Sequence, residues 1–274
     1  MKTYVRAMTP ADARRLLETQ VRNRSVSRNT VIKYQTDMRE GLWVFNGEPI
    51  RFDENGRLLD GQHRLHAVAG MPEEFSVDFL IIEGLPSSSQ LSMDQGRKRT
   101  AGDQLGLQGV RNGRHVASAV KTIIMYERNA FFDVNTGMRK HSDQVTNATI
   151  ERWVGENPDE TEVISDGISQ MRTIDAPASL SGAIHVILRR IEVDQAEDFF
   201  RRLSTGADLH LNHPILTLRN RFALIRRDRI RSTDRDYIGM YFTAWNAFRK
   251  GRDISRIQRP TGDGWDRSNF PRPI

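Results

Sequence analysis

The stretch Asp60-Gly61-Gln62-His63-Arg64 joins an apolar run that is typical of a strand to an apolar pattern that is typical of a short helix. We expect the strand to end before the glycine and the helix to run from the glycine to about residue 69. The first N–H groups of a helix have no partners within the helix, and they lie at the positive end of its dipole. The sequence therefore predicts a site for a phosphate group at the start of this helix.

Each position of this motif suits phosphate chemistry in its own way. Gly61 lets the backbone approach an anion closely, and Arg64 in the first turn can clamp phosphate oxygens. Gln62 and His63 add hydrogen-bond donors, while Asp60 can hold Mg²⁺ or take a proton from an acceptor hydroxyl. The alternative is an ordinary hairpin and helix, in which Asp60 caps the helix and the other polar side chains face water.

The residues around the motif predict a small α/β unit. The stretch Asp53-Glu54-Asn55-Gly56 lies between two apolar runs and is a strong hairpin signal. The predicted elements are a helix capped by Thr9, a helix from about 27–29 to Gly41, hairpin strands at 49–52 and 57–59, the motif helix, a strand over 75–82, a short helix over 86–90 and a strand at 91–93.

The rest of the chain has mainly helical periodicity. We expect helices over 116–126, 181–191, 195–203, from Pro214 to about 225, and over 237–248 with Thr233 as its cap. The final stretch is rich in Pro, Gly and Asp, which predicts a loop or a disordered tail. The predicted fold class is therefore α+β, with an α/β unit over 1–105, a helical domain over 106–258 and an irregular tail over 259–274.

Composition limits the classes of protein to consider. A hydrophobic content of 38% and a charged content of 28% are those of a globular protein with a true core. No apolar run approaches the length needed to span a bilayer, and the first residues do not resemble a signal peptide. Cysteine is absent, which excludes disulfides, thiolate catalysis and cysteine-bound zinc. We expect a cytoplasmic protein without a membrane partner.

The net charge of +6 comes mainly from arginine, and residues 214–259 hold twelve Arg or Lys against four Asp. Arginine forks match phosphate oxygens, so this excess favours a polyanionic partner, most simply DNA. The candidate contacts are Arg219, Arg221, Arg226 and Arg227, on and after one predicted helix. The alternative is a solvated helix face whose arginines pair with neighbouring aspartates.

A second polar cluster, at residues 94–100, follows the strand predicted at 91–93. Arg97, Arg99 and Thr100 can form another basic wall of the phosphate pocket, with Asp94 facing a metal ion, and Thr100 is also a suitable cap for a following helix. The alternative is a solvated turn. Asn46 and Glu48, at the start of the hairpin, are weaker candidates for the same pocket.

The motif, the following Ala67 and the hairpin before it together resemble the signature of the ParB/sulfiredoxin-like superfamily, including the DGQHR-motif proteins related to DndB and phage-encoded ParB-like proteins. The resemblance covers about residues 25–105. It implies that Gly61 and Arg64 bind nucleotide phosphates. Gln62 stands where sulfiredoxins have their catalytic cysteine, so sulfiredoxin chemistry is excluded. Asp60 and His63 resemble the Asp-Gly-His motif of the kinase branch of this superfamily.

The resemblance implies a nucleotide-binding protein that acts on or with DNA and uses ATP or CTP with Mg²⁺. NTP hydrolysis, or phosphoryl transfer to a hydroxyl such as one on a modified DNA base, is the leading hypothesis, with Asp60 or His63 as catalytic residue. One alternative is a non-catalytic DNA-binding or regulatory module. A second is a metal-dependent nuclease in which Asp60 and Asp94 converge on the metal.

Overall fold

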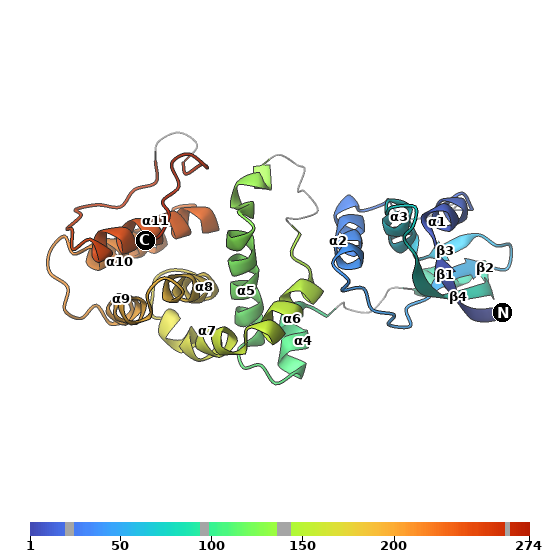
Figure 1. Cartoon of the computed structure of the whole chain (residues 1–274), viewed down its shortest axis with the longest axis horizontal. Coiled ribbons are helices and arrows are strands. Elements are labelled where there is room, and N and C mark those ends of the chain that lie inside the picture. Colours follow the sequence, from blue (N-terminus) through green and yellow to red (C-terminus); the bar gives the residue numbers. More distant parts are fainter. Residues whose placement is uncertain (20–24, 94–98, 136–143, 261–263) are drawn as a thin grey trace. The chain divides into compact units, whose positions relative to one another are not determined.

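The computed structural model describes residues 1–19, 25–93, 99–135, 144–260 and 264–274, and the chain groups into two compact units. The first unit comprises Met1–Lys98 and Arg139–Thr149, and the second comprises Arg99–Met138 and Ile150–Ile274. A small mixed sheet belongs to the first unit and the second is helical, which confirms the predicted α+β class (Figure 1). No helix of the described residues has the length and apolar character needed to cross a bilayer.

The first unit is built on a four-stranded sheet with the strand order β1-β4-β2-β3. Strand β1 is antiparallel to β4, β4 is parallel to β2, and β2 forms an antiparallel hairpin with β3. The elements in chain order are β1 (Lys2–Met8), α1 (Pro10–Leu17), α2 (Arg28–Arg39), β2 (Ile50–Asp53), β3 (Leu58–Asp60), α3 (Gln62–Ala69), β4 (Val77–Leu85) and the 3₁₀ helix η1 (Ser87–Ser92).

The core of this unit lies between the sheet and its helices. Alternate strand residues such as Ile50, Phe52 and Ile81 are buried, and they pack in one cluster with Leu65 and Val68 of α3. Burial of apolar surface stabilises a fold by about 25 cal/mol per Å², so such a cluster is the main source of stability. Helix α3, which begins at the motif, is therefore fixed to the sheet by its own apolar side.

Several predicted elements of this unit are confirmed. Thr9 caps α1 and Ser27 caps α2, in each case by accepting from an N–H of the first turn. The hairpin turn is closed by Asp53, whose Oδ1 accepts from the N–H groups of Asn55 and Arg57 at 2.8 Å each. These hydrogen bonds, the one from Arg57 foremost, lower the pKa of Asp53.

One prediction for this unit is wrong, and one strand was not predicted. The strand expected at 91–93 is not formed, because residues 87–92 belong to the 3₁₀ helix η1. Strand β1 was not expected from the sequence, since most of its residues are exposed and show no buried alternation. It exists because its seven residues pair with β4 along its whole length, from Lys2 opposite Glu83 to Met8 opposite Val77.

A segment distant in sequence completes the first unit. Thr146 donates its hydroxyl to Oδ1 of Asp37 on α2 at 2.5 Å. The Oγ1 of Thr146 also accepts from the N–H of Thr149, so a second hydrogen bond holds this hydroxyl. Burial raises the pKa of Asp37, because an apolar environment disfavours the charged carboxylate. The residues around Thr146 are therefore part of this unit even though they follow two helices of the other one.

The second unit is helical, and the helices expected over 116–126, 181–191, 195–203, from Pro214 and over 237–248 are confirmed. Helix α4 belongs here because it packs against α5, where Gly102 and Gly113 allow close approach. Thr233 forms a capping box with Asp236 at the start of α11, as predicted for the cap. The elements are α4 (Ala101–Leu107), α5 (Gly113–Glu127), the 3₁₀ helix η2 (Ala130–Asn135), α6 (Asn147–Glu156), whose first residues group with the first unit, α7 (Pro158–Met171), α8 (Ala178–Arg189), α9 (Val193–Thr205), α10 (Pro214–Arg227) and α11 (Asp234–Arg249).

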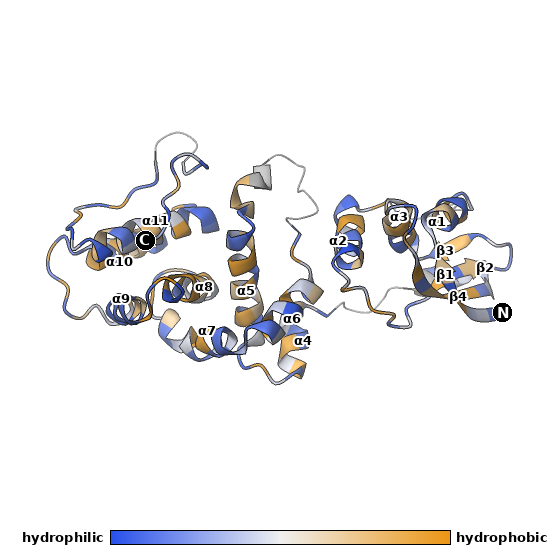
Figure 2. Cartoon of the chain, in the orientation of Figure 1, coloured by the Kyte–Doolittle hydropathy of each residue, from blue (hydrophilic) through white to orange (hydrophobic). Residues whose placement is uncertain are grey.

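Aromatic side chains dominate the core of the second unit. Phe199 and Phe200 of α9 and Tyr241 and Trp245 of α11 are all essentially inaccessible to solvent. The buried hydroxyl of Tyr241 is hydrogen-bonded to Ser181 at 2.7 Å, which satisfies the one polar group of that ring. Hydrophobic and hydrophilic residues alternate along the helices (Figure 2).

The tail after α11 is irregular, as predicted, but a few of its described residues pack against the helices. Trp265 is buried against Gly239, where a Cβ would lie 2.6 Å from ring atom Cδ2. Trp245 donates its indole N–H to the carbonyl oxygen of Ile274 at 2.8 Å. The Nδ2 of Asn246 donates to the carbonyl oxygen of Arg272, and its Oδ1 accepts from the N–H of Ile274. The absence of a side chain at Gly239, in the middle of α11, therefore makes room for the ring of Trp265.

Candidate functional site

The predicted motif lies at the junction between β3 and α3 (Figure 1). Asp60 is the last residue of β3 and pairs across the hairpin with Arg51. Gly61 follows with a φ of 102°, and Gln62 begins the helix. A Cβ at Gly61 would lie 3.0 Å from Cγ1 of Ile50 on β2. Both the backbone angle and the packing therefore require glycine at this position.

Arg64 lies in the first turn of α3, as expected, but its guanidinium is turned inward. It donates to the carbonyl oxygens of Glu48 at 2.7 Å and Pro49 at 2.8 Å, and to Oδ2 of Asp60 at 3.2 Å. The residue is 8% exposed. Arg64 therefore connects the chain entering β2 with the end of β3, and it is not an open clamp for phosphate.

Asp60 lies between two arginines. Its Oδ2 accepts from Arg51 at 2.5 Å and from Arg64 at 3.2 Å. Two guanidinium groups this close occupy this oxygen and repel a divalent cation. Asp60 does not cap α3, so neither its predicted role as a metal ligand nor the alternative role as N-cap fits its contacts. The described residues contain no group of three or more His, Asp or Glu side chains placed to hold a metal ion.

His63 is buried and connects α3 to the start of α2. Its Nε2 accepts from the backbone N–H of Ser27 at 2.9 Å, which assigns that nitrogen as unprotonated. Ser27 is itself the N-cap of α2, so this contact fixes where the second helix begins. Gln62 is also buried, at 5% exposure. His66, one turn later, has a pKa lowered by burial.

The structure brings the weaker candidates Asn46 and Glu48 close to the motif. The carbonyl oxygen of Glu48 accepts from Arg64, and its side-chain Oε2 lies 3.9 Å from the same guanidinium. Asn46 turns the chain just before this point, because its Oδ1 accepts from the N–H of Glu48 at 3.0 Å. These contacts hold residues 46–49, the loop that leads into β2 and is called the entry loop below.

The second predicted wall of the pocket is only partly described. Asp94 and Arg97 lie outside the described residues. Arg99 and Thr100 belong to the second unit, where Thr100 forms a capping box with Asp103 at the start of α4. The hydrogen bonds from Thr100, its backbone N–H first, lower the pKa of Asp103 to about 2. The cap predicted at Thr100 is confirmed, and the wall itself stays a prediction.

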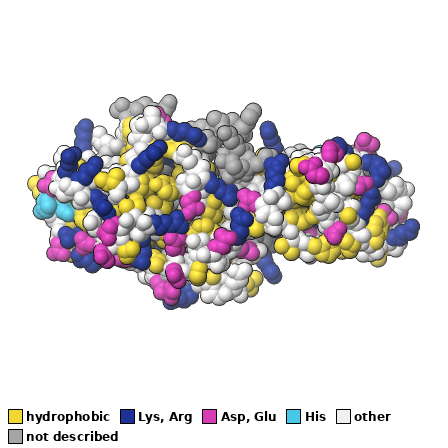
Figure 3. Space-filling model, viewed as in Figure 1, with side chains coloured by type: hydrophobic (Ala, Val, Ile, Leu, Met, Phe, Trp, Pro, Cys, Tyr) yellow, Lys and Arg dark blue, Asp and Glu magenta, His cyan; other side chains and the backbone are white. Residues whose placement is uncertain are grey.

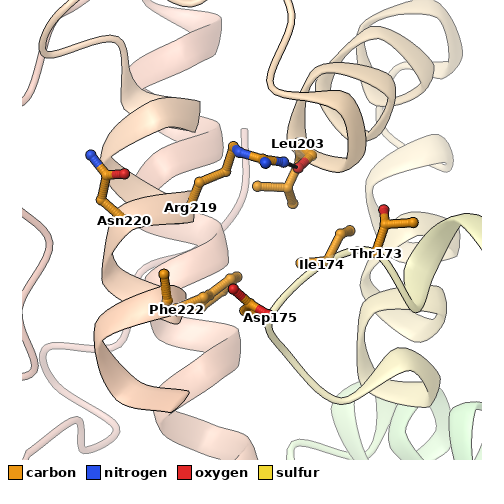
Figure 4. A pocket seen from close by; sticks show the side chains of 8 residues that line it. Thr173, Ile174, Asp175, Leu203, Arg219, Asn220 and Phe222 are labelled. Atoms are coloured by element: carbon orange, nitrogen blue, oxygen red, sulfur yellow. Dashed lines mark hydrogen bonds between the residues drawn. The ribbon is translucent and has the colours of Figure 1, made fainter. Parts of the chain in front are cut away.

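The four arginines predicted to contact nucleic acid have different environments. Arg219 reaches from α10 to the carbonyl oxygen of Leu203, across a small pocket of about 120 Å³ (Figure 4). Arg221 is half-buried. Arg226 and Arg227 have exposed side chains but pair with Asp175 and Asp228. On the visible face of the molecule, basic and acidic side chains are mixed (Figure 3).

Two residues that contact the motif were not predicted from the sequence. Arg51 is the closer of the two arginines to Asp60, and Ser27 is the partner of His63. Strand pairing gave a signal for the first, because hairpin residues nine apart face each other across a four-residue turn. The second had no signal, since the contact joins residues 36 apart.

The geometry of the motif is that of a glycine-led helix start held by partly buried ion pairs and by a histidine. Comparison of the chain with protein-family models, with curated proteins and with solved structures gave no match to any of them.

Proposed function

We propose that this chain binds a nucleotide through its phosphate groups at the start of α3 and acts on or with DNA. The observation that carries the proposal is the junction at Gly61, where α3 begins without a side-chain cap. The first N–H groups of such a helix are the donors that anion-binding turns use, and the dipole adds to their attraction. ATP or CTP, with Mg²⁺ carried by the phosphates, are the ligands that the resemblance implies.

In this proposal Arg64 and Asp60 are positioning residues. The ion pairs from Asp60 to Arg51 and Arg64 hold the end of β3 against the entry loop, and so fix the direction of α3. A preorganised turn binds an anion without ordering costs at the moment of binding. The resemblance gives Arg64 the role of binding phosphate. In this proposal the N-terminus of α3, whose first turn contains Gln62, binds the phosphate instead.

Hydrolysis or phosphoryl transfer is the sharper form of the proposal. Such chemistry needs an acceptor aligned with the phosphate and positive charge around it. Both arginines bind Oδ2 of Asp60, so this carboxylate would act as a base through Oδ1. His63 has to release the N–H of Ser27 before its Nε2 can accept a proton. Catalysis by His63 therefore requires a rearrangement on binding, whereas binding alone does not.

A second candidate is a non-catalytic DNA-binding module in which the motif has a purely structural role. The observation in its favour is that Asp60, His63 and Arg64 all have partners within the protein. This candidate predicts no response to free nucleotides and no turnover. The two candidates are therefore separated by nucleotide binding itself.

The test is a thermal-shift panel of ATP, CTP, GTP, UTP and ADP with Mg²⁺. A nucleotide at about one hundred times its Kd should stabilise the protein by roughly 2.7 kcal/mol. The diagnostic variant is Gln62→Glu, which puts a carboxylate of the same shape in the first turn of α3. We expect it to repel phosphate and lose the shift, measured against its own melting temperature.

The matched control is Gln195→Glu, which introduces the same charge in the first turn of α9, in the other unit. This side chain is exposed, and the control should respond to nucleotide like the wild type. Arg64→Ala is a poor choice, because loss of its ion pair disturbs the turn itself. The proposal fails if none of the five nucleotides shifts the wild type, or if Gln62→Glu retains the full shift.

A further inference from the structure

A groove in the second unit lies between the segment that joins α7 to α8, the end of α10 and the beginning of α11. It has a volume of about 550 Å³ and is open to solvent. Ligand pockets of a few hundred Å³ and more can take a nucleotide-sized group. Its lining comes from Arg172, residues 174–178, residues 225–226, residues 229–230 and Tyr237. All of these belong to one compact unit, so the groove is formed within that unit.

The floor of the groove is apolar. Ile174 and Ile225 form it and are almost fully buried, while Ile230 remains 38% exposed at its edge. Tyr237 lines the same groove, and its ring is held in place by contact with Phe222 at a centroid distance of 5.4 Å. A flat apolar group of a ligand, such as a nucleobase, can therefore bury its surface here.

The rim of the groove is basic. Arg172, Arg226 and Arg229 line it and are exposed, against one acidic residue, Asp175, which pairs with Arg226. Arg229 adopts a φ of 50° in the turn that ends α10. Three guanidinium groups around an apolar floor complement a ligand that combines phosphates with flat apolar groups.

The start of α8 adds to the positive character of this groove. Pro177 is the N-cap of α8, provides no side-chain cap and lines the groove together with Ala178. The adjoining pocket, which Arg219, Ile174 and Asp175 line (Figure 4), has a volume of only about 120 Å³. Ile174 and Asp175 also line the groove. A ligand is therefore expected over the groove and not in that pocket.

From this combination we infer that the groove binds single-stranded nucleic acid, with backbone phosphates at Arg172 and Arg229 and a base over the apolar floor. A duplex keeps its bases stacked inside and offers no free base to the floor, whereas a single strand offers both groups. The inference rests on the DNA half of the proposed function. It is independent of nucleotide binding at α3, which lies in the other unit.

The test is fluorescence anisotropy of the full chain with a labelled thymidine oligonucleotide of about 16 nucleotides, the upper range for one binding fold. The diagnostic variant is Arg172→Gln with Arg229→Asn, since asparagine tolerates the left-handed backbone at residue 229. We expect about tenfold weaker binding and a salt slope smaller by about 1.4, or about 0.7 for each lost contact.

The matched control is Arg111→Gln with Arg114→Gln, which removes the same charge from equally exposed arginines of the same unit. It should bind within about twofold of the wild type, since exposed charges away from a site act only weakly. Ile230→Ser should weaken binding without changing the salt slope, because it removes apolar contact alone.

Three results would overturn the inference. These are equal losses in the two double variants, a duplex of the same length bound as tightly as the single strand, and displacement of the oligonucleotide by polyglutamate at equal charge concentration. If no nucleotide shifts the melting temperature but oligonucleotide binding depends on Arg172 and Arg229, the site at α3 is rejected and the groove is retained. If a nucleotide shifts the melting temperature but oligonucleotide binding does not depend on these arginines, the groove is rejected and the site at α3 is retained.

Discussion

The guanidinium of Arg64 lies 3.2 Å from Oδ2 of Asp60, with the arginine 8% exposed. The two residues are the last and first of the motif, and their contact closes the turn that carries Gly61 between them. The same guanidinium holds two carbonyl oxygens of the entry loop. The polar residues of the motif thus support one another before any ligand arrives.

Replacing Arg64 by methionine should lower the free energy of unfolding by about 3 kcal/mol, because a half-buried carboxylate and two carbonyl groups lose a partner. Urea denaturation measures this directly. Arg14→Met is the control, since Arg14 pairs with Glu73 at an exposed site and should cost less than about 1 kcal/mol. Similar losses in the two variants would show that the Arg64 ion pair is not a stabilising contact.

Replacing Gly61 by alanine should destabilise the protein more than replacing Gly56 does. Both glycines have positive φ, at 102° and 75°, so both variants strain the backbone by about 1 kcal/mol or more. Only at Gly61 does the added Cβ meet another residue, Ile50, whereas Gly56 has open space. Equal melting temperatures for the two variants would contradict the close packing of the turn on β2.

Replacing Gly239 by alanine should displace Trp265 and loosen the tail, since the new methyl group occupies the place of the indole ring. We expect a red shift of tryptophan fluorescence and a loss of about 2 kcal/mol, as for an overpacked core. Gly167 of α7 is the control, because its Cβ would meet only Met171 at 3.7 Å. Gly167→Ala should raise stability by about 0.5–1 kcal/mol through helix propensity. An unchanged spectrum for Gly239→Ala would argue against the packed tail.

His185 should make the protein sensitive to acid. Burial foremost, and Arg189 nearby, lower its pKa from 6.5 to about 4, and its ring packs on Phe200. The unfolded chain therefore takes up this proton first as the pH falls below 6.5. The stability due to the neutral ring is complete above that pH and is lost as the pH falls toward 4, which amounts to about 2 kcal/mol at pH 5.

His185→Gln removes this titration. Urea denaturation at pH 7 and pH 5 should show a smaller loss in the variant than in the wild type, by roughly that 2 kcal/mol. The comparison cancels the other groups that titrate in this range. If both proteins lose the same free energy between the two pH values, His185 is not neutral in the folded state.

Local signals in the sequence were enough for most helices and for the hairpin. Thr9, Thr100 and Thr233 cap helices where expected, because a cap depends on residues within one turn. Gly61 was also placed correctly before its helix. These features are decided by a few neighbouring residues, which is the information that a sequence pattern holds.

Features that depend on distant partners could not be predicted in the same way. Strand β1 is defined by pairing with β4, and the packed tail is defined by a glycine in the middle of α11. At the motif, residue types indicated phosphate chemistry, whereas the side chain of Arg64 is directed inward by carbonyl groups at 48 and 49. Composition and spacing do not determine which acceptor an arginine reaches.

The hydrogen bond between Thr146 and Asp37 has a consequence for protein synthesis. The two residues are 109 positions apart, and α4 and α5 of the other unit lie between them in the chain. At typical translation rates the partner of Asp37 is made about 5–20 s after Asp37 itself. During that interval the nascent first unit carries an unpartnered aspartate on α2, and it reaches its final state only after residues 99–138 of its neighbour have been made.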